Sequence, residues 1–382
     1  MKNKLTIRLA LLILCALSLN TDFAQNARTN PVVKKQTTTT KKQTTAKQQT
    51  TTAKKQPSKS TKKKQVTTHK WKEVGDYYDG LVWVVDDNDK CGYIDKTGKV
   101  VIPCQWKIAG TFSEGLAAVK DFNDKWGYID KTGRLVSPCQ WKVAVNFSEG
   151  LAAVQDANYK YGYIDKTGQV VIPCKWKWAF PFSEGLAAVQ DANYKYGFID
   201  KTGRIVIPCE WKVAGHFSEG LTAVEDANRK CGYIDKTGKL VIPCQWKYAE
   251  SFHEGLAVVG DFNDKYGFID KTGTVVIPCQ WEYAYDFSEG LAAVEDANDK
   301  FGFIDKTGKL VIPCQWKDAV IFREGLAKVL DFNDKYGYID KTGTVVIPCQ
   351  WKDAGDFREG LAKVQDANGK YFYIDKTGKV VM

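Results

Sequence analysis

A tryptophan recurs every 35 residues along most of this chain, and this fixed period constrains the fold more than any other feature. Self-similarity at a constant period indicates a repeat architecture, in which one supersecondary unit is copied and stacked. We therefore interpret residues 71–382 as one tandem array of nine units. A residue that occurs once per unit is expected to be structural, because one active site does not need nine copies. The recurring tryptophans are Trp71, Trp106, Trp141, Trp176, Trp211, Trp246, Trp281, Trp316 and Trp351.

Each unit contains three segments with strand character, as the unit that begins at Trp141 illustrates. Leu151–Gln155 is small and apolar, Tyr161–Asp165 is aromatic and β-branched, and Gln169–Trp176 includes a run of Val, Val and Ile. The segments between them are rich in Asp, Asn, Thr and Gly, and Lys166–Gly168 has the composition of a three-residue hairpin loop. No segment shows a helical apolar stripe. The sequence predicts an all-β fold of three-stranded antiparallel meanders.

Two arrangements of the units are compatible with this pattern. A three-stranded sheet of this size is marginal alone, so neighbouring units must cover each other's apolar faces, either in a propeller-like ring or in an open superhelix. The ends of the array fit a ring, because Val66–Trp71 is in phase with Val101–Trp106. Nine units, however, exceed the usual four to eight blades of a propeller, and near-identical copies favour growth by simple addition. On this balance we expect the open superhelix.

Residues 1–24 have the features of an export signal. Lys2, Lys4 and Arg8 give a positive start, Leu9–Leu19 is apolar, and Ala24 is a small residue at the predicted cleavage point. The apolar run is shorter than the roughly 20 residues that a membrane-spanning helix needs, and no later stretch is long enough. We expect an exported mature chain without a transmembrane segment, located in the periplasm, at the cell surface or outside the cell.

Residues 25–70 form a basic segment of Thr, Lys and Gln with almost nothing apolar to bury. It carries 13 Lys or Arg and no Asp or Glu, whereas the array has 39 basic and 44 acidic residues. This composition predicts a disordered linker. The linker is interpreted either as a solvated spacer or as an electrostatic tether to an anionic surface. Because the linker lacks aromatic residues for base stacking, and because we expect export, nucleic acid is not an expected partner.

Two sequence blocks recur in nearly every unit at constant spacing. One is Lys-Trp-Gly-Tyr-Ile at Lys125–Ile129, followed by Asp-Lys-Thr-Gly at Asp130–Gly133, and the other is Phe147–Ala152. These blocks resemble the bacterial WG (tryptophan-glycine, or KWG) repeat family, and the resemblance covers residues 71–382. The chain departs from the family at the name-giving position, where only Trp126 precedes its Gly and most other units have Tyr or Phe. The resemblance implies an exported or surface-associated repeat array without an established shared activity.

Two recurring motifs resemble functional sites and are better interpreted as turns. Asp270–Thr274 and Asp340–Thr344 match the phosphorylation motif of P-type ATPases, but that chemistry requires a phosphotransfer domain and a membrane bundle. Asp121–Asp124 has alternating carboxylate and amide oxygens, as calcium sites do. Lys125 stands where a further oxygen ligand would be needed, so we predict no metal site at these positions.

Most cysteines occupy one recurring position and are interpreted as small buried packing residues. Bridges between units are not expected, because equivalent positions in neighbouring sheets are roughly 10 Å apart and a disulfide needs Cα atoms within about 7 Å. Two further cysteines leave intra-hairpin disulfides open, Cys91 with Cys104 and Cys231 with Cys244. In the simplest register Cys91 faces Pro103, which would place the two sulfurs on opposite faces of the sheet.

Catalytic residues are not evident in the pattern. His69, His216 and His253 occupy unrelated contexts, and no metal-ligand spacing occurs. The Glu of the recurring Phe-Ser-Glu-Gly block, such as Glu149 and Glu184, has no paired carboxylate in sequence and is interpreted as a solvated loop charge. The sequence therefore predicts neither an enzyme nor a cofactor.

The predicted function is that of an exported, non-enzymatic β-repeat scaffold, which binds a protein or an envelope polymer over an extended surface. The alternative is a cell-wall or glycan-binding module that the basic segment tethers. In that alternative the aromatic row of Trp126, Tyr161, Tyr196 and Tyr266 would stack on sugar rings. Packing of the same rings between units is the competing interpretation.

Overall fold

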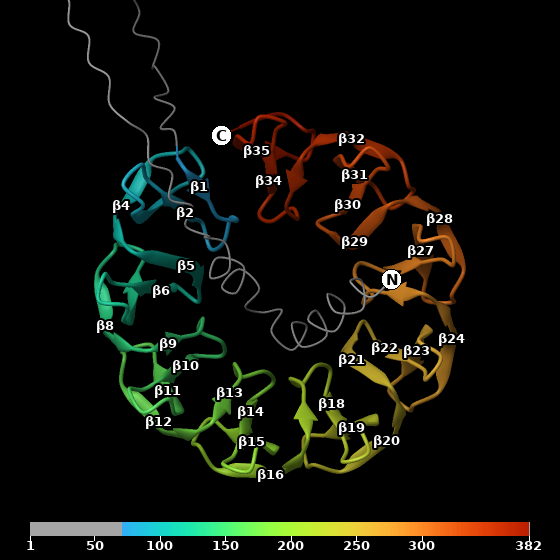
Figure 1. Cartoon of the computed structure of the whole chain (residues 1–382), viewed down its shortest axis with the longest axis horizontal. Helices are drawn as coiled ribbons and strands as arrows, with labels where there is room; N and C mark the ends of the chain where they lie inside the picture. Colours follow the sequence, from blue (N-terminus) through green and yellow to red (C-terminus); the bar gives the residue numbers. More distant parts are fainter. Residues whose placement is uncertain (1–70, 382) are drawn as a thin grey trace, which may run out of the picture.

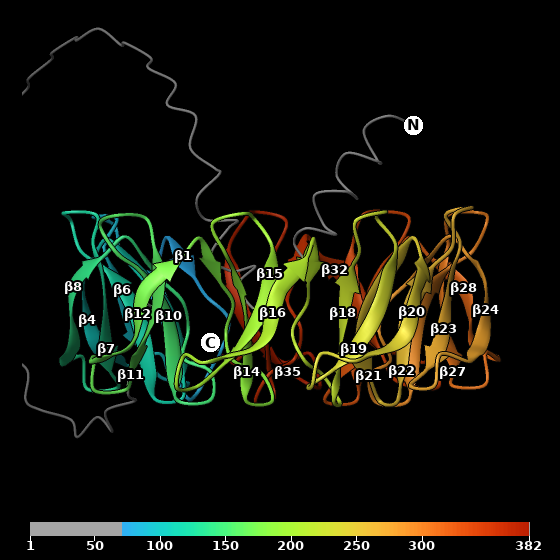
Figure 2. The same ribbon diagram turned by 90° about the horizontal axis from the view of Figure 1, so that it is seen from below.

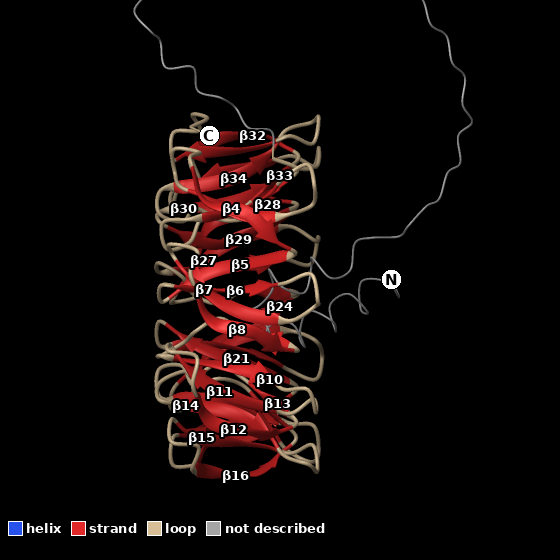
Figure 3. Cartoon of the chain, turned by 90° about the vertical axis from the view of Figure 1, so that its left-hand side faces the viewer, coloured by secondary structure: helices blue, strands red, loops and turns tan. Residues whose placement is uncertain are grey.

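The computed structural model describes residues 71–381, and every regular element in them is a β-strand. The strands form nine antiparallel sheets, which we call blades 1 to 9 in chain order. The blades stand around one axis and form a ring, with the first strand of each blade nearest the centre and the fourth at the rim (Figure 1). Seen from the side, the strands run roughly along the axis of the ring (Figure 2), and loops cover both of its faces (Figure 3).

The strands are grouped by their position in the blade. The first strands are β1 (Glu73–Val74), β5 (Ile108–Ser113), β9 (Val143–Ala144), β13 (Trp178–Ala179), β17 (Val213–Ala214), β21 (Tyr248–His253), β25 (Tyr283–Ala284), β29 (Asp318–Arg323) and β33 (Asp353–Ala354). The second strands are β2 (Val82–Val85), β6 (Leu116–Lys120), β10 (Leu151–Gln155), β14 (Leu186–Gln190), β18 (Leu221–Glu225), β22 (Leu256–Gly260), β26 (Leu291–Glu295), β30 (Leu326–Leu330) and β34 (Leu361–Gln365).

The remaining strands complete the blades toward the rim. The third strands are β3 (Cys91–Ile94), β7 (Trp126–Asp130), β11 (Tyr161–Asp165), β15 (Tyr196–Asp200), β19 (Cys231–Asp235), β23 (Tyr266–Asp270), β27 (Phe301–Asp305), β31 (Tyr336–Ile339) and β35 (Tyr371–Asp375). The fourth strands are β4 (Val100–Trp106), β8 (Leu135–Trp141), β12 (Val170–Trp176), β16 (Ile205–Trp211), β20 (Leu240–Trp246), β24 (Val275–Trp281), β28 (Leu310–Trp316) and β32 (Val345–Trp351).

The predicted all-β array of nine units is confirmed, and the predicted strands and turns match the structure. In the turn between the third and fourth strands of blade 3, the Asp165 carboxylate accepts hydrogen bonds from the Thr167 N–H at 2.8 Å and from its hydroxyl at 2.6 Å. Gly168 has a φ of 85°, as the hairpin loop requires. The Asp-Lys-Thr-Gly motif is therefore a turn, in which the aspartate is a structural acceptor.

The units differ from the prediction because eight of the nine blades have four strands. The segment that the sequence suggested was only a link between units forms the additional first strand, as in β9, where Val143 and Ala144 pair with β10. A two-residue turn joins these strands, and its Glu149 and Gly150 have φ values of 52° and 88°. Positive φ at both central residues is the geometry of a type I′ hairpin. This turn explains why every unit carries Gly after the acidic residue.

The apolar core consists of separate clusters that lie between neighbouring blades. One cluster joins Tyr163 and Ile172 of blade 3 to Phe182, Val189 and Ile199 of blade 4, and all five side chains are at most 1% exposed. Nine such clusters are present among the described residues. Each blade therefore buries one apolar face against the preceding blade and the other against the following blade.

The expected open superhelix is wrong, because the ninth blade packs against the first. Tyr373 of blade 9 belongs to the same buried cluster as Tyr77, Val82 and Val84 of blade 1. The Tyr373 hydroxyl also donates to the carbonyl oxygen of Gly75, as the equivalent Tyr163 hydroxyl does to Phe180 at 2.7 Å. Closure covers the apolar faces that an open array would leave exposed at both ends. The structure is therefore a nine-bladed propeller.

A carboxylate clasp on one face of the ring connects each of blades 2 to 8 to the blade that follows it. The Glu149 Oε2 of blade 3 accepts a hydrogen bond from the Gly185 N–H at 3.0 Å and pairs with Lys201 Nζ at 3.1 Å, both in blade 4. Ser148 adds a bond from its hydroxyl to the Phe182 carbonyl oxygen at 2.7 Å. The interpretation of this glutamate as a solvated charge is wrong. The same backbone and lysine contacts recur at Glu114, Glu184, Glu219, Glu254, Glu289 and Glu324.

Closure makes the seam between blades 9 and 1 contribute to stability, as the other interfaces do. We expect Tyr373→Phe and Tyr163→Phe each to lower the free energy of unfolding by about 1 kcal/mol, because each removes one hydroxyl that donates to a buried carbonyl. Phe198, Phe268 and Phe303 occupy the equivalent position in other blades, so the substitution is sterically compatible. Urea denaturation measures both changes. A seam variant as stable as the native chain would contradict closure.

Because the clasp uses ionised carboxylates, we expect the free energy of unfolding of the ring to decrease in acid. Burial alone would raise the pKa of Glu184, but hydrogen bonds from Lys236 and the Gly220 N–H outweigh it and lower that pKa below 4.5. The clasp therefore stabilises the fold above pH 4.5 and is lost as the pH falls through the lowered pKa.

We expect Glu184→Gln to cost about 1 kcal/mol of folding stability at pH 7, because the side chain keeps an acceptor but loses the ion pair with Lys236. The cost should shrink toward zero in acid, where the native carboxyl is also neutral. Urea titrations at several pH values measure it. Glu210→Gln is the matched control, because Glu210 is exposed and most other blades carry Gln there. A difference in unfolding free energy between the native chain and Glu184→Gln that does not change with pH would refute the stabilising role of the clasp.

Candidate interaction surface

The two faces of the ring carry different turns, because antiparallel strands alternate in direction. The turns after the first and third strands lie on one face, which we call the clasp face. The turns between the second and third strands lie on the opposite face, together with the connections between blades. We letter these two strands B and C and call this side of the ring the BC face. On the clasp face the acidic side chains hold neighbouring blades together, so a binding function must be sought among the remaining residues.

A pocket of about 370 Å³ on the clasp face is lined by Tyr78, Arg323, Arg358 and nearby clasp residues. The two arginines stand where most blades have the clasp serine. Arg323 Nε lies 3.2 Å from Asp356 Oδ2, and the Arg358 guanidinium lies 4.4 Å from the centre of the Tyr78 ring. The cationic groups of this pocket are therefore already engaged within the ring.

The two described histidines lie close together on the first strands and turns of blades 5 and 6. His216 Nε2 lies 3.4 Å from Ser251 Oγ, and His253 Nε2 lies 3.5 Å from Asp286 Oδ2. Burial, with a contribution from Asp286, raises the pKa of Glu250 to about 8. The serine and the aspartate contact different imidazoles, so these groups do not form the continuous nucleophile, base and carboxylate chain of a hydrolase. His69 lies outside the described residues.

The four aromatic residues proposed to stack on sugars lie between the blades. Trp126 and Tyr161 are only 6% and 4% exposed, and Tyr196 and Tyr266 are partly buried. Rings as buried as Trp126 and Tyr161 cannot stack on a sugar. The ring contacts of Tyr161, Tyr196 and Tyr266 fit the packing role that the sequence left as the competing interpretation. Tyr161 contacts Trp178 with ring centres 5.1 Å apart, Tyr196 contacts Phe180 at 6.1 Å, and Tyr266 stacks on Tyr248 at 6.0 Å.

The four cysteines considered for disulfides, Cys91, Cys104, Cys231 and Cys244, are free thiols in the structure. The register predicted for the first pair is wrong, because a β-bulge places Cys91 opposite Trp106 instead of Pro103. The Cys91 thiol lies 3.6 Å from the Lys107 carbonyl oxygen. Burial raises the pKa of Cys91 to about 11 and that of Cys231 to about 12. Little thiolate is therefore present at neutral pH, and these thiols are poor nucleophiles.

The turns that suggested a calcium site use their oxygens to close the turn. Asp121 Oδ1 accepts hydrogen bonds from the N–H groups of Asn123 and Lys125, both at 2.9 Å. Within residues 71–381 no group of three or more His, Cys, Asp or Glu side chains is arranged to hold a metal ion. The same part of the chain contains no helix with the length and apolarity of a membrane crossing.

The BC face carries five aromatic side chains that are largely exposed. A typical buried ring of this fold is less than 10% exposed, whereas these are 58% to 65% exposed. Apolar rings in solvent are common at binding surfaces, where they provide large contact areas at low entropic cost. The exposed rings are Phe122 in blade 2, Tyr159 in blade 3, Tyr194 in blade 4, Phe262 in blade 6 and Phe332 in blade 8.

Each exposed ring occupies a variable position of an otherwise constant turn. The turn reads Asp-x-Asn-x-Lys in every blade, and the first or second x is aromatic in the five blades named above. The second x has positive φ in blades 1 to 8, for example 61° at Tyr159. The chain accepts Asp, Tyr or Arg at this position, so the identity of the side chain is independent of the fold.

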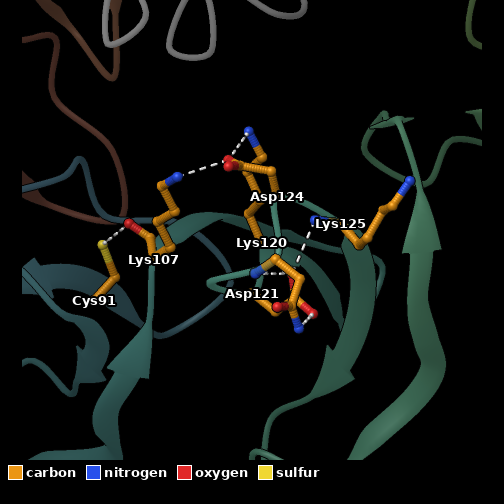
Figure 4. A network of polar contacts seen from close by, with 7 residues as sticks. Cys91, Lys107, Lys120, Asp121, Asp124 and Lys125 are labelled. Atoms are coloured by element: carbon orange, nitrogen blue, oxygen red, sulfur yellow. Dashed lines mark hydrogen bonds and ion pairs between the residues drawn. The ribbon is translucent and has the colours of Figure 1, made fainter.

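Lysines of the BC face pair in two ways that depend on this variable residue. In blade 2, Lys107 Nζ and Lys120 Nζ converge on Asp124 Oδ1 at 2.7 Å and 2.8 Å (Figure 4). In blade 3, the lysine equivalent to Lys107 is Lys142, and its Nζ lies 3.4 Å from the centre of the Tyr159 ring. Blades 3 and 4, which carry tyrosine at this position, thus replace an ion pair with a cation–π contact.

The aromatic residues predicted from the sequence as sugar contacts are the third-strand residues beside the constant glycine. The exposed rings of the BC turns were not among them. A signal was present, because an aromatic residue inside an Asp-x-Asn-x-Lys turn has no strand partner to pack against. Turn tips lie at the surface, so a ring at that position is expected to be exposed.

The chain is remotely similar to several solved structures. Similar solved structures include the computationally designed protein Ika8, with 12% identity, a TM-score of 0.43, and coverage of 72% of this chain and 95% of that chain. BamB from Moraxella catarrhalis has 10% identity, a TM-score of 0.39, and coverage of 79% and 95%. Sqt1 from Saccharomyces cerevisiae has 11% identity, a TM-score of 0.42, and coverage of 71% and 93%. No curated protein matches the chain.

A model of the WG containing repeat matches this chain in eight consecutive segments, and together these segments cover more than half of its length. The matches follow the 35-residue period of the blades. The matched segments are residues 92–126, 126–160, 161–195, 196–229, 232–266, 266–300, 301–336 and 336–371. The chain therefore belongs to the family of proteins built from the WG containing repeat.

Proposed function

We propose that this protein is an exported, non-enzymatic scaffold that binds another macromolecule through the BC face of its ring. The supporting observation is the set of five exposed aromatic rings on that face, from Phe122 to Phe332, each 58% to 65% exposed. The clasp face contributes the carboxylate contacts that hold the blades together. The BC face provides the accessible apolar area that macromolecular binding requires.

The asymmetry of the BC face supports binding of a specific partner. Blades 2, 3 and 4 carry exposed rings in three consecutive positions, whereas blades 5, 7 and 9 have none at their BC turns. A purely structural repeat has no need for this difference, because Ala, Asp, Arg and Gly serve the same turn elsewhere. We infer that the ring provides the frame and that selected turns provide the contacts.

Export and tethering are part of the proposal, and both concern residues outside the described range. Residues 1–24 have the composition of an export signal, and residues 25–70 carry 13 positive charges. In this proposal the basic segment holds the ring near an anionic envelope surface, and the BC face selects the partner there. The alternative function, a cell-wall or glycan-binding module, is favoured by the same exposed rings, since aromatic faces also bind sugars.

The BC face is tested by replacing all five rings with residues that other blades carry at the same positions. Phe122, Phe262 and Phe332 become Ala, and Tyr159 and Tyr194 become Asp. We expect the full-length variant to fold like the native chain and to lose most of its retention on isolated cell-envelope material. The rings supply the contacts, so their loss should raise the amount of unbound protein several-fold, as measured by co-sedimentation.

The matched control changes Arg134 and Arg204, on the clasp face, to the Thr found at the equivalent positions 274 and 344. This control should be retained like the native chain. Undiminished retention of the ring-free variant would overturn the proposal that the BC face binds.

The tethering role of the basic segment predicts a strong salt dependence. We expect retention of the full chain on anionic vesicles to fall steeply between 0.1 M and 1 M salt, because the screening length shortens from about 10 Å to about 3 Å. Replacing the lysines of residues 25–70 with Gln keeps the segment polar and removes the attraction. Equal retention of the native chain and the Gln variant, measured by vesicle flotation, would show that the segment is only a spacer.

A further inference from the structure

Two adjacent blades of the BC face differ from the others in both charge and aromatic content. In blades 1, 2, 6 and 8 the lysine after the recurring tryptophan pairs with a turn aspartate, for example Lys72 with Asp89 at 2.9 Å. In blades 3 and 4 tyrosine replaces that aspartate. Lys142 Nζ then lies 3.4 Å from the centre of the Tyr159 ring, and Lys177 Nζ lies 3.6 Å from that of Tyr194.

These two lysines lack the neutralising carboxylate that the equivalent lysines of blades 1, 2, 5, 6 and 8 have. Among residues 71–381 no carboxylate forms an ion pair with Lys142 or Lys177. The nearest constant acid of blade 3, Asp156, is occupied by the turn, because its Oδ1 accepts from the N–H groups of Asn158 and Lys160 at 2.9 Å. The positive charge at blades 3 and 4 is therefore available to an external anion.

A second lysine, from the preceding blade, contributes to each tyrosine site. The hydrogen bond and charge of Lys142 lower the pKa of Tyr159, and Lys125 of blade 2 adds to this effect. Lys177 and, to a smaller extent, Lys160 lower the pKa of Tyr194 in the same way. Each ring therefore lies in the positive potential of two ammonium groups that belong to neighbouring blades.

The tyrosine rings remain accessible despite their lysine contacts. Tyr159 is 65% exposed and Tyr194 is 64% exposed, so the ring face opposite the lysine is open to solvent. Trp178, which follows Lys177 directly, is 36% exposed and adds a third ring at blade 4. The combination of an open aromatic face with flanking ammonium groups thus occurs twice in succession, at equal positions of two equivalent blades.

The geometry points to an acidic polysaccharide as the ligand of this tyrosine–lysine arc, which consists of Lys125, Lys142, Tyr159, Lys160, Lys177 and Tyr194. This inference rests on the proposed binding function of the BC face. The apolar face of a sugar ring can stack on each tyrosine, and its carboxylate can accept charge-assisted hydrogen bonds from the flanking lysines. A polymer with one carboxylate per sugar repeats the same two groups, so it can occupy both blades at once.

Other macromolecules match the arc less well. A neutral glycan would leave the four lysines without a counter-charge, and an acidic polypeptide chain would supply carboxylates but no rigid ring to stack. Single-stranded nucleic acid supplies both rings and charge. It is disfavoured by the export signal, which places the ring outside the cytoplasm in the proposed function. These polymers therefore serve as the comparison ligands.

The experiment measures binding of the full chain, with the lysines of residues 25–70 replaced by Gln so that this segment contributes no charge. The probes are polygalacturonate, neutral dextran, polyglutamate and single-stranded oligo(dT), each tested by calorimetry at 0.1 M salt. We expect polygalacturonate to bind most tightly and dextran not to bind. Equal or tighter binding of polyglutamate or oligo(dT) would overturn the assignment to a polysaccharide.

Variants separate the rings from the charge. Tyr159→Arg with Tyr194→Arg adds positive charge and is compatible with the turn, because blade 5 has Arg229 there with a φ of 61°. We expect this variant to bind polygalacturonate about tenfold or more weakly, because both ring contacts are lost. Tyr159→Phe with Tyr194→Phe keeps the rings and should retain binding. Unchanged or tighter binding of the arginine variant would show that charge alone binds the probe and would refute the arc.

A matched control adds arginine at the equivalent turn position elsewhere on the BC face. Gly369→Arg adds one positive charge in blade 9, outside the arc, without removing a carboxylate, and should leave polygalacturonate binding unchanged. If the native chain does not bind polygalacturonate, yet the ring-free variant loses its retention on envelope material, the inferred ligand is wrong and the proposed function stands. If retention is also independent of the rings, both are wrong.

Discussion

Every blade of this ring has two apolar faces, and the rest of the structure depends on covering both. A single four-stranded sheet of such short strands is marginal in water, and here the buried side chains meet between blades rather than within them. Each interface is therefore a shared core. An open array would leave one apolar face bare at each end, whereas the contact of Tyr373 with Tyr77 and Val82 removes both bare faces at once. Closure makes the terminal blades equivalent to the internal ones.

The same constraint explains the small residue in the family's name-giving pair. An added Cβ at Gly162 would lie 2.4 Å from the Ile172 carbonyl oxygen, because the bulged fourth strand passes directly over the third. The aromatic residue before it fills the space between blades, so Trp, Tyr or Phe are all suitable, whereas only glycine fits beside the bulge. Blade 9 departs from this pattern, because it carries Phe372 in place of the glycine.

The parts of the fold that could be predicted are those with local causes. The second to fourth strands follow from β-branched and aromatic runs, and the turns follow from Asp, Asn and Gly. The first strand was missed because in most blades it has only two residues, as in Val143–Ala144, too few for an alternating pattern. The clasp was missed because Glu149 meets Gly185 and Lys201, which are 36 and 52 residues away. Ring closure depends on the angle between blades, which packing of both faces sets and no single unit encodes.

The binding surface was only partly predictable, because an aromatic residue looks the same in sequence whether a neighbouring blade covers it or not. Tyr161 and Tyr159 are two residues apart, yet one is 4% exposed and the other 65%. The difference follows from their positions, since the first starts a strand that packs against the next blade and the second caps a turn. Comparison of the nine blades separates residues that the fold needs from residues that it does not need. A residue that all nine blades share is explained by the fold. Tyrosine at positions 159 and 194 is not, because other blades use Asp, Arg or Gly there. In the proposed function, departures from the repeat, rather than the repeat itself, therefore mark the contacts with a partner.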